Sequence, residues 1–233
     1  MNHDNGIDAR ALSQFKDFSA FSSLQLDKIA VSMTVKKIKK GTRIFDQDEA
    51  AKMLYLVLSG TVKLSLVNDG GRDVLLSLLP PGEIFGLGSF LPATQHPFRS
   101  DAFSDCTIGV IRPEALIDAL LGIPGELFIR FNELTMSRVW TMFLRCTRGI
   151  GLNLRKRLAL ALLEISESFG KQHSRGTALS IDLTHEDLAN AIGVSRQKVT
   201  NCLAEFERRR ILIRDGRRLI IDSRRLRQVV QGA

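Results

Sequence analysis

The chain contains 233 residues, of which 44% are hydrophobic and 25% charged, as in an ordinary globular protein with one large domain or two modest ones. Its apolar runs fall far short of the roughly 20 residues that a membrane span needs, and no signal peptide is recognisable, so we expect a cytoplasmic protein with no membrane partner. The net charge of +8 lies mostly in the segment from Leu152 onward, which favours a polyanion partner, although a solvated basic surface would also explain it.

The first 123 residues predict a β-rich domain behind a short helical stretch, Ser13 to Met33. Between Val35 and Ile111, short apolar runs alternate with Gly, Pro, Asn and Asp turn signals about every 8 to 12 residues. This pattern is typical of a small antiparallel barrel or jelly roll, here called the β-roll.

Residues 124–151 predict a long helix that Pro124 opens and that Gly149 and Gly151 end. Apolar residues recur along it at alternating steps of three and four, which keeps them on one stripe. The stripe consists of Met136, Val139, Phe143, Cys146 and Ile150. We interpret it as the seam of a homodimer, with packing against the chain's own β-roll as the alternative.

Residues 152–233 predict a second domain with a helix-turn-helix. Asn153 is placed to cap a helix over Leu154–Ser168, and Thr184 with Asp187 resembles the capping box of a shorter one that Gly193 ends. Ser195 is predicted to cap the next helix, whose apolar positions recur at i, i+3, i+4 and i+7. Those inward positions are Val199, Cys202, Leu203 and Phe206.

The outward positions of that second helix carry the side chains expected to read DNA. They are Arg196, Gln197, Thr200 and Asn201. Arg pairs with guanine through two hydrogen bonds, and Gln or Asn pairs with adenine, so this set suits the major groove. Thr184, Ser195 and Lys198 are better placed for phosphates, which fix register without reading sequence. A two-helix corner of any globular protein is the alternative interpretation.

A hairpin follows directly, because Ile211–Arg214 and residues 217–221 flank the turn signal Asp215-Gly216. The motif is therefore predicted to be a winged helix-turn-helix. Arginines near the hairpin tip either reach a phosphate backbone or are simply solvated.

Nearly end to end, the chain resembles the family of the cyclic-AMP receptor protein and the fumarate-nitrate reduction regulator, the Crp-Fnr family. The resemblance rests on five segments: 54–64 (LYLVLSGTVKL), 81–86 (PGEIFG), 99–100 (RS), 183–189 (LTHEDLA) and 193–200 (GVSRQKVT). It implies an α+β protein with an N-terminal β-roll, a long dimerisation helix and a C-terminal winged helix-turn-helix. It also implies a homodimer on a palindromic promoter site in double-stranded DNA, with RNA polymerase as a further partner.

The resemblance places an effector pocket in the β-roll and on the long helix, formed by Gly86, Leu87, Arg99, Ser100, Met142 and Phe143. Members that bind cyclic nucleotides have a Glu for the ribose hydroxyl where this chain has Leu87, and small hydroxyl residues where it has Met142 and Phe143. A ribose hydroxyl facing Leu87 would lose its partner, at a cost of about 1 to 3 kcal/mol. Both departures disfavour cyclic AMP, so we expect another small-molecule effector, or DNA binding without one.

Other sensing chemistries find little support. The family's iron-sulfur sensors use a cysteine cluster near the N-terminus, whereas no cysteine here precedes Cys106. A haem needs a well-placed axial ligand, and His96 lies before Pro97 in a predicted loop, where we expect it to be solvent-exposed.

An enzyme is not expected, because the histidines lack paired-ligand spacing and neither a nucleophile elbow nor a phosphate-binding glycine loop occurs. The histidines are His3, His96, His173 and His185. We therefore predict no catalytic residue, no metal and no certain cofactor. The alternatives to a regulator with an unidentified effector are a cyclic-AMP-dependent activator and, in another class, a ligand-binding regulatory module that acts on a protein partner.

Overall fold

The computed structural model describes residues 7–15, 18, 21–67, 73–121, 125–216 and 218–232. It divides into two compact units. The first comprises the described residues up to Leu66 and those of Ser77–Phe143, and the second comprises those of Val67–Leu76 and those from Leu144 onward. Each unit is described by itself.

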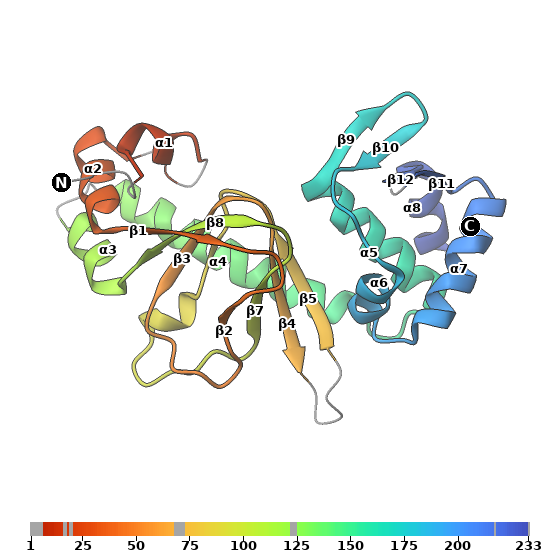
Figure 1. The fold of residues 1–233 in the computed structure, drawn as a ribbon, viewed down its shortest axis with the longest axis horizontal. Coiled ribbons are helices and arrows are strands. Elements are labelled where there is room, and N and C mark those ends of the chain that lie inside the picture. Colours follow the sequence, from red (N-terminus) through yellow and green to blue (C-terminus); the bar gives the residue numbers. More distant parts are fainter. Residues whose placement is uncertain are drawn as a thin grey trace. The chain divides into compact units, whose positions relative to one another are not determined.

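Two four-stranded sheets form the β-roll of the first unit, in the orders β1-β8-β3-β6 and β2-β7-β4-β5 (Figure 1). The strands are β1 (Thr34–Ile38), β2 (Arg43–Phe45), β3 (Leu54–Ser59), β4 (Val62–Val67), β5 (Asp73–Leu79), β6 (Ile84–Phe85), β7 (Arg99–Ala102) and β8 (Cys106–Ile111). The ring of Phe45 in the second sheet contacts Tyr55 and Phe85 in the first, at centroid distances of 5.4 and 6.0 Å. These aromatic residues thus fill the space between the sheets, and the predicted β-roll is confirmed.

Three helices cover the other face of the β1-β8-β3-β6 sheet: α1 (Ala9–Ser13), α2 (Ser23–Ser32) and α3 (Pro113–Leu120). Ser22 and Gln25 form a capping box at the start of α2, and Leu26 and Ile29 bury its inner side in one core cluster with Leu54 and Leu56 of β3. The predicted helical stretch from Ser13 to Met33 is therefore wrong in outline, because helix begins earlier and is divided into α1 and α2.

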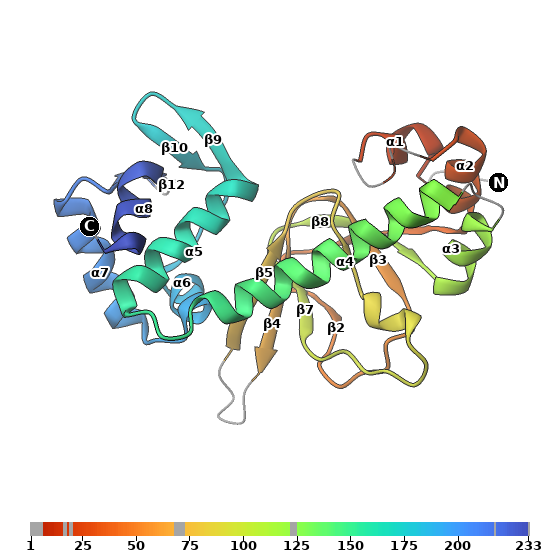
Figure 2. The same ribbon diagram turned by 180° about the vertical axis from the view of Figure 1, so that it is seen from behind.

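The long helix α4 spans Gly125–Arg148 and, up to Phe143, runs alongside the β-roll (Figure 2). Arg138 on this helix forms an ion pair with Glu83, which lies in the loop before β6. Among the described residues, no helix is long and apolar enough to cross a membrane.

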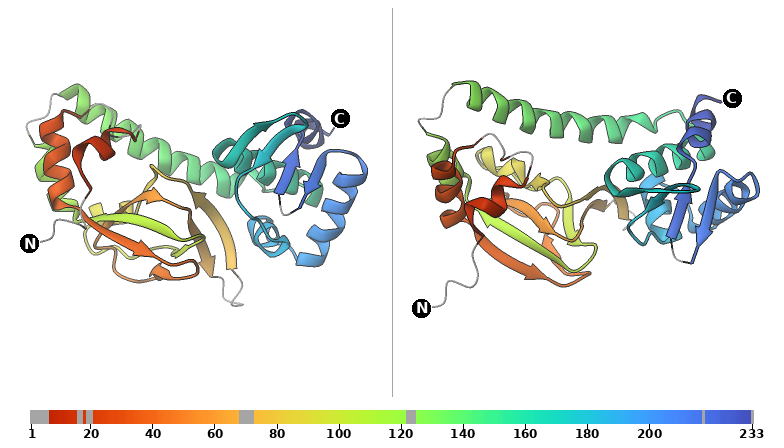
Figure 3. Two further views of the ribbon diagram at one scale, coloured as in Figure 1. Left: turned by 45° about the horizontal axis from the view of Figure 1, so that its top comes forward. Right: turned by 90° about the horizontal axis from the view of Figure 1, so that it is seen from above.

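The second unit contains a four-stranded sheet in the order β11-β12-β10-β9. Figure 3 shows its strands and helices, coloured from teal to dark blue, in two further views. Its elements are α5 (Leu154–Phe169), β9 (Gly170–His173), β10 (Gly176–Leu179), α6 (His185–Ile192), α7 (Arg196–Arg208), β11 (Leu212–Asp215), β12 (Arg218–Ile221) and α8 (Ser223–Gln231). A single core cluster unites the helices with the sheet, from Leu158 and Leu162 of α5 to Leu226 of α8. The β9–β10 hairpin and α8 were not predicted.

Candidate functional site

The first helix of the motif, α6, begins and ends as predicted. The Thr184 hydroxyl accepts a hydrogen bond from the Asp187 amide at 3.0 Å, and the Asp187 carboxylate accepts one from the Thr184 amide at 2.9 Å. Gly193 then adopts φ = 65° at the C-cap, a left-handed conformation that costs glycine little. The turn between α6 and α7 is therefore defined by local backbone chemistry.

The second helix, α7, starts at Arg196 and buries the predicted inner face: Val199, Cys202, Leu203 and Phe206. Burial raises the pKa of the Cys202 thiol to about 11. Ser195 occupies the N-cap with an extended backbone, but among the described residues its hydroxyl receives no capping hydrogen bond. Ser195 is thus the N-cap residue, as predicted, but its contribution is that of its carbonyl, which accepts hydrogen bonds from the Lys198 and Val199 amides at 3.0 and 3.3 Å.

The predicted outward side chains of α7 divide into two groups. Arg196, Gln197, Lys198 and Asn201 are exposed, and the Gln197 amide donates to the Asn201 side-chain oxygen at 3.1 Å. Thr200 is half-buried instead, because its hydroxyl donates to the Arg196 carbonyl at 3.0 Å and lies 2.8 Å from Nδ1 of His185. Thr200 therefore does not project outward as expected, and the sequence pattern gave no sign of its partner on α6.

The wing is the hairpin of β11 and β12, with its turn one residue later than predicted. Asp215 pairs with Arg218, so it belongs to the ladder, and Gly216 enters the turn with φ = 59°. Arg217 lies outside the described residues. The Arg214 guanidinium faces back toward the helices, donating from Nε to the Glu207 carboxylate at 3.2 Å.

The predicted seam of α4 is an exposed apolar stripe. Met136 is 66% exposed, Phe143 is 55% exposed and Val139 is also exposed. The side chain of Cys146 lies outside those that the structure describes, and Ile150 lies in a turn beyond the end of α4. Ile150 is therefore not part of a helical seam, because the helix ends at Arg148.

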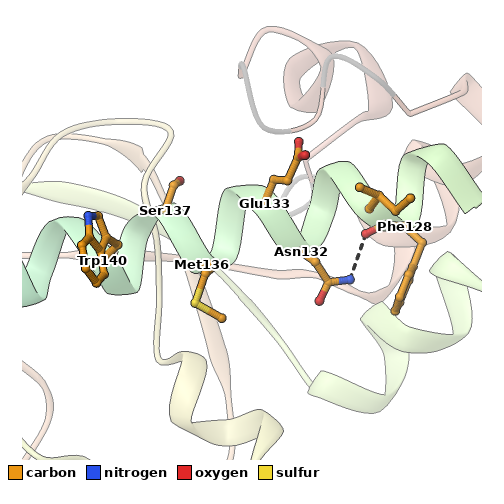
Figure 4. A pocket seen from close by; sticks show the side chains of 7 residues that line it. Phe128, Asn132, Glu133, Met136, Ser137 and Trp140 are labelled. Carbon is orange, nitrogen blue, oxygen red and sulfur yellow. Dashed lines mark hydrogen bonds between the residues drawn. The ribbon is translucent and has the colours of Figure 1, made fainter.

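Three apolar side chains extend this stripe and were missed: Phe128, Ile129 and Trp140. The Trp140 ring stacks on Phe143 at a centroid distance of 5.7 Å. Together with Asn132 and Met136 they line a shallow apolar concavity along α4 (Figure 4). The sequence contains part of this signal, since residue 129 continues the alternating steps of three and four through 132 to 136. Position 132 is the polar Asn132, however, and Phe128 and Trp140 each lie one residue off that series.

In the β-roll, Gly86 and Leu87 occupy the turn between β6 and a short 3₁₀ helix, Leu87–Phe90. Gly86 has φ = 81°, and a Cβ there would lie 2.6 Å from the Met53 carbonyl, so only glycine fits. Leu87 packs against the core cluster beneath the helices. The Leu87 side chain is thus part of the packing of the fold.

Arg99 and Ser100 are not brought together. Successive residues of a strand point to opposite faces, so Arg99 and Asp101 share one face of β7 and Ser100 the other. The Arg99 Nε lies 3.2 Å from the Ser65 hydroxyl and 3.3 Å from the Asp101 carboxylate, which also accepts from Arg43 at 2.7 Å. The two side chains therefore do not converge on one point here, and their joint grip on an anion stays a prediction.

Ser100 is fully buried, and its hydroxyl finds no hydrogen-bond partner in the described part of the chain. On α4, Met142 is half-buried, whereas Phe143 is exposed within the apolar stripe. Phe143 was assigned both to the effector pocket and to the seam, and its exposure favours the seam.

The expectation that His96 is solvent-exposed is wrong. Its side chain is 2% exposed and stacks on Phe45 at a ring distance of 3.7 Å. Burial lowers the pKa of His96, while the charge of Glu49 opposes that shift. Across the described ranges, no three His, Cys, Asp or Glu side chains cluster as metal ligands would.

Comparisons with known proteins agree on both units. A cyclic nucleotide-binding domain model matches residues 35–121, and a Crp-like helix-turn-helix domain model matches residues 156–229. The chain is 28% identical over 202 residues to the CRP-like cAMP-activated global transcriptional regulator of Mycobacterium tuberculosis, covering 80% of this chain and 84% of that one. It is 24% identical over 191 residues to the global nitrogen regulator of Synechococcus elongatus, with coverage of 81% and 86%.

Among solved structures, FixK2 from Bradyrhizobium japonicum has the same fold, with a TM-score of 0.71 at 20% identity. That match covers 84% of this chain and 96% of FixK2.

Proposed function

This chain belongs to the Crp-Fnr family of DNA-binding transcription regulators, and we propose that it acts as a homodimer on a palindromic promoter site. The observation that carries the proposal is the exposed polar row of Arg196, Gln197 and Asn201 on a helix whose opposite face is fully buried. A helix held in this way enters the major groove as a rigid body.

Each exposed side chain on α7 suits a particular contact. Arg196 pairs with guanine, whereas Gln197 and Asn201 have the amide geometry for adenine. Lys198 and the exposed Ser195 lie at the same end of the helix and are assigned to phosphates, as is Thr184 at the start of α6. Sequence reading and backbone anchoring are thus divided between neighbouring residues.

Dimerisation is supported by the apolar stripe of α4. Large apolar side chains at this exposure, which include Met136, Trp140 and Phe143, are costly in a monomer. Their spacing along one 24-residue helix is that of a coiled-coil seam, which would pair with the same face of a second copy. Two recognition helices would then meet half-sites about one DNA turn apart, roughly 34 Å. RNA polymerase is the expected further partner at a promoter.

The β-roll is proposed to sense a small molecule other than cyclic AMP, or to support DNA binding without a ligand. Leu87 is half-buried against the core cluster, and the Arg99 guanidinium already lies against Ser65 and Asp101. Neither is arranged to receive a ribose phosphate. A cyclic-AMP-dependent activator remains the second candidate, because the relative from Mycobacterium tuberculosis is named as cAMP-activated.

Selection of bound duplexes from a random library, with purified full-length protein, tests the proposal. A palindromic consensus with two equal half-sites is expected. A non-palindromic consensus would refute the dimeric arrangement. Failure to shift any random duplex at low salt would instead favour a ligand-binding module that docks on another protein.

A further inference from the structure

His185, the first residue of α6, lies between the recognition helix α7 and the wing strand β11. Its side chain is half-buried, and both of its ring nitrogens have partners. Nδ1 lies 2.8 Å from the Thr200 hydroxyl on α7, and Nε2 lies 3.1 Å from the Arg214 guanidinium on β11. One imidazole thus touches all three elements that a winged helix-turn-helix presents to DNA.

The direction of these hydrogen bonds follows from the partners. A guanidinium can only donate, so Nε2 must accept from Arg214 and the ring proton must be on Nδ1. Nδ1 then donates to the Thr200 oxygen, and the Thr200 hydroxyl donates onward to the Arg196 carbonyl at 3.0 Å. The chain of donors runs from the wing through α6 to the first turn of α7, and it requires a neutral imidazole.

We propose that His185 is a positioning residue for DNA recognition, which holds the base-reading end of α7 and the wing in register only while its ring is neutral. The inference rests on the proposed DNA-binding function. It assigns Thr200 an internal role, through the carbonyl of Arg196, in place of direct base reading. It also explains why Arg214, although it belongs to the wing, points back toward Glu207 and α6.

Protonation would break this arrangement at a defined point. If both ring nitrogens were protonated, the N–H group at Nε2 would face an N–H group of Arg214, with no acceptor between them. The imidazolium and guanidinium cations would also be adjacent. Burial lowers the pKa of His185, the charges of Arg214 and Arg196 lower it further, and Glu207 on α7 opposes them. Because the folded pKa lies below the ordinary 6.5, the neutral ring is retained at neutral pH, and the arrangement is lost only as the pH falls through that lowered pKa.

The test measures the ratio of specific to nonspecific affinity across pH 5.5 to 8, using the palindrome that the wild type selects and a scrambled duplex of equal length. For the wild type this ratio should fall roughly fivefold on acidification, the equivalent of one net hydrogen bond. Two variants remove the titrating ring: His185→Asn retains an amide donor near Nδ1, and His185→Gln retains an acceptor near Nε2. Both should have a lower ratio of specific to nonspecific affinity at neutral pH, and that ratio should not depend on pH.

A matched pair at Thr200 separates positioning from base contact. Thr200→Val removes the hydroxyl but retains the shape, whereas Thr200→Ser retains the hydroxyl and should preserve both the ratio and its pH dependence. If Thr200 acts through His185, the losses of Thr200→Val and His185→Asn will not add in the double variant. Additive losses would mean that Thr200 reads a base directly, and they would overturn the proposal.

Two further outcomes are decisive. A wild-type ratio that stays constant or rises as the His185 ring becomes protonated would show that His185 does not act as a neutral positioning residue. Such a result, with nonspecific binding intact, would leave the proposed function standing. Absence of binding to either duplex at every pH would instead refute the DNA-binding function itself. Thermal unfolding at each pH identifies any variant that has simply lost its fold.

Discussion

The two units treat their polar side chains in opposite ways. On α7 the charged and amide groups expected to act are exposed, with Arg196 and Lys198 unburied. In the β-roll the corresponding groups are engaged inside the fold, with Arg99 against Asp101 and Ser100 fully buried. A surface for a large external polyanion must leave its cations accessible, whereas the β-roll pairs its own within the fold. The contrast teaches that the contacts of a residue, and not its place in a family motif alone, decide whether it is available to an external partner.

Apolar side chains of the first unit differ from one another in the same respect, namely whether they are packed within the fold or exposed. Leu87, expected in a ligand pocket, contributes to the core, while Met136 and Phe143 of the same unit are left in solvent. Leu87 therefore finds its apolar contacts within its own unit, whereas the α4 stripe leaves large apolar side chains in solvent.

The largest expected effect comes from a substitution in the exposed apolar stripe of α4. Phe143→Asp would place a charge in the middle of the α4 stripe, so it should yield a monomer and lower specific DNA affinity by about a hundredfold or more, since one half-site remains. Sedimentation measures the oligomeric state. Thr141→Asp, an exposed position on the same helix away from the stripe, is the control. A Phe143→Asp dimer of unchanged stability would contradict the seam.

Arg196→Ala tests whether the exposed Arg196 side chain on α7 recognises a DNA base. Loss of a bidentate guanine contact should cost about 1 to 3 kcal/mol at the selected palindrome and relax preference at one base pair per half-site. Titration of the cognate duplex and of single-base variants measures both. An unchanged consensus would remove Arg196 from the reading set.

Lys198→Ala is the comparison variant on the same helix turn. If Lys198 meets a phosphate, all duplexes should weaken equally, and the dependence of log affinity on log salt should lose about one unit of slope per contact. A change confined to the cognate palindrome would instead place Lys198 among the base readers.

Asp101→Asn tests whether the polar groups of the β-roll serve the fold. The Asp101 carboxylate accepts a hydrogen bond from Arg43 and lies 3.3 Å from the Nε atom of Arg99, and its side chain is largely buried. Removing its charge should therefore lower the free energy of unfolding by about 1 to 3 kcal/mol. Denaturant titration measures this loss. Asp118→Asn, an exposed carboxyl on α3, should change little. Equal stabilities would mean that Asp101 is retained for a ligand.

The smallest expected effect is that of cyclic AMP on the wild type. Because Leu87 offers no hydroxyl partner, calorimetry should show no binding, or binding no tighter than about millimolar, with little change in DNA affinity. Micromolar binding coupled to tighter DNA association would restore the cyclic-AMP-dependent activator.

Sequence periodicity was sufficient for the elements with strong local signals. The capping box of Thr184 and the glycine at 193 define α6, and the buried spacing from Val199 to Phe206 defines α7. The β9–β10 hairpin was missed because residues 170–179 are short, polar and without alternation. Helix α8 was missed because only Leu226 is fully buried in it.

The β-roll site was harder to predict for a geometric reason. Which of Arg99 and Ser100 faces the interior of the β-roll depends on the register of β7 against β4, where Ser65 pairs with Arg99 and Leu64 with Ser100. A shift of one residue would exchange the two faces, and no local pattern fixes that register. The role of Thr200 likewise depends on His185, fifteen residues earlier in the chain.

Among the side chains that the structure describes, each unit contains one buried thiol: Cys106 in the β-roll and Cys202 on the inner face of α7. Burial raises the pKa of both, so neither thiolate is available to an alkylating reagent in the closed molecule. Alkylation of either thiol therefore requires local opening of the surrounding structure. Its rate at each cysteine, measured by peptide mass spectrometry, reports the free energy of local opening of that unit alone. Comparing the alkylation rates of Cys106 and Cys202 with and without bound DNA therefore tells whether DNA binding suppresses local opening in the second unit only, or in both units.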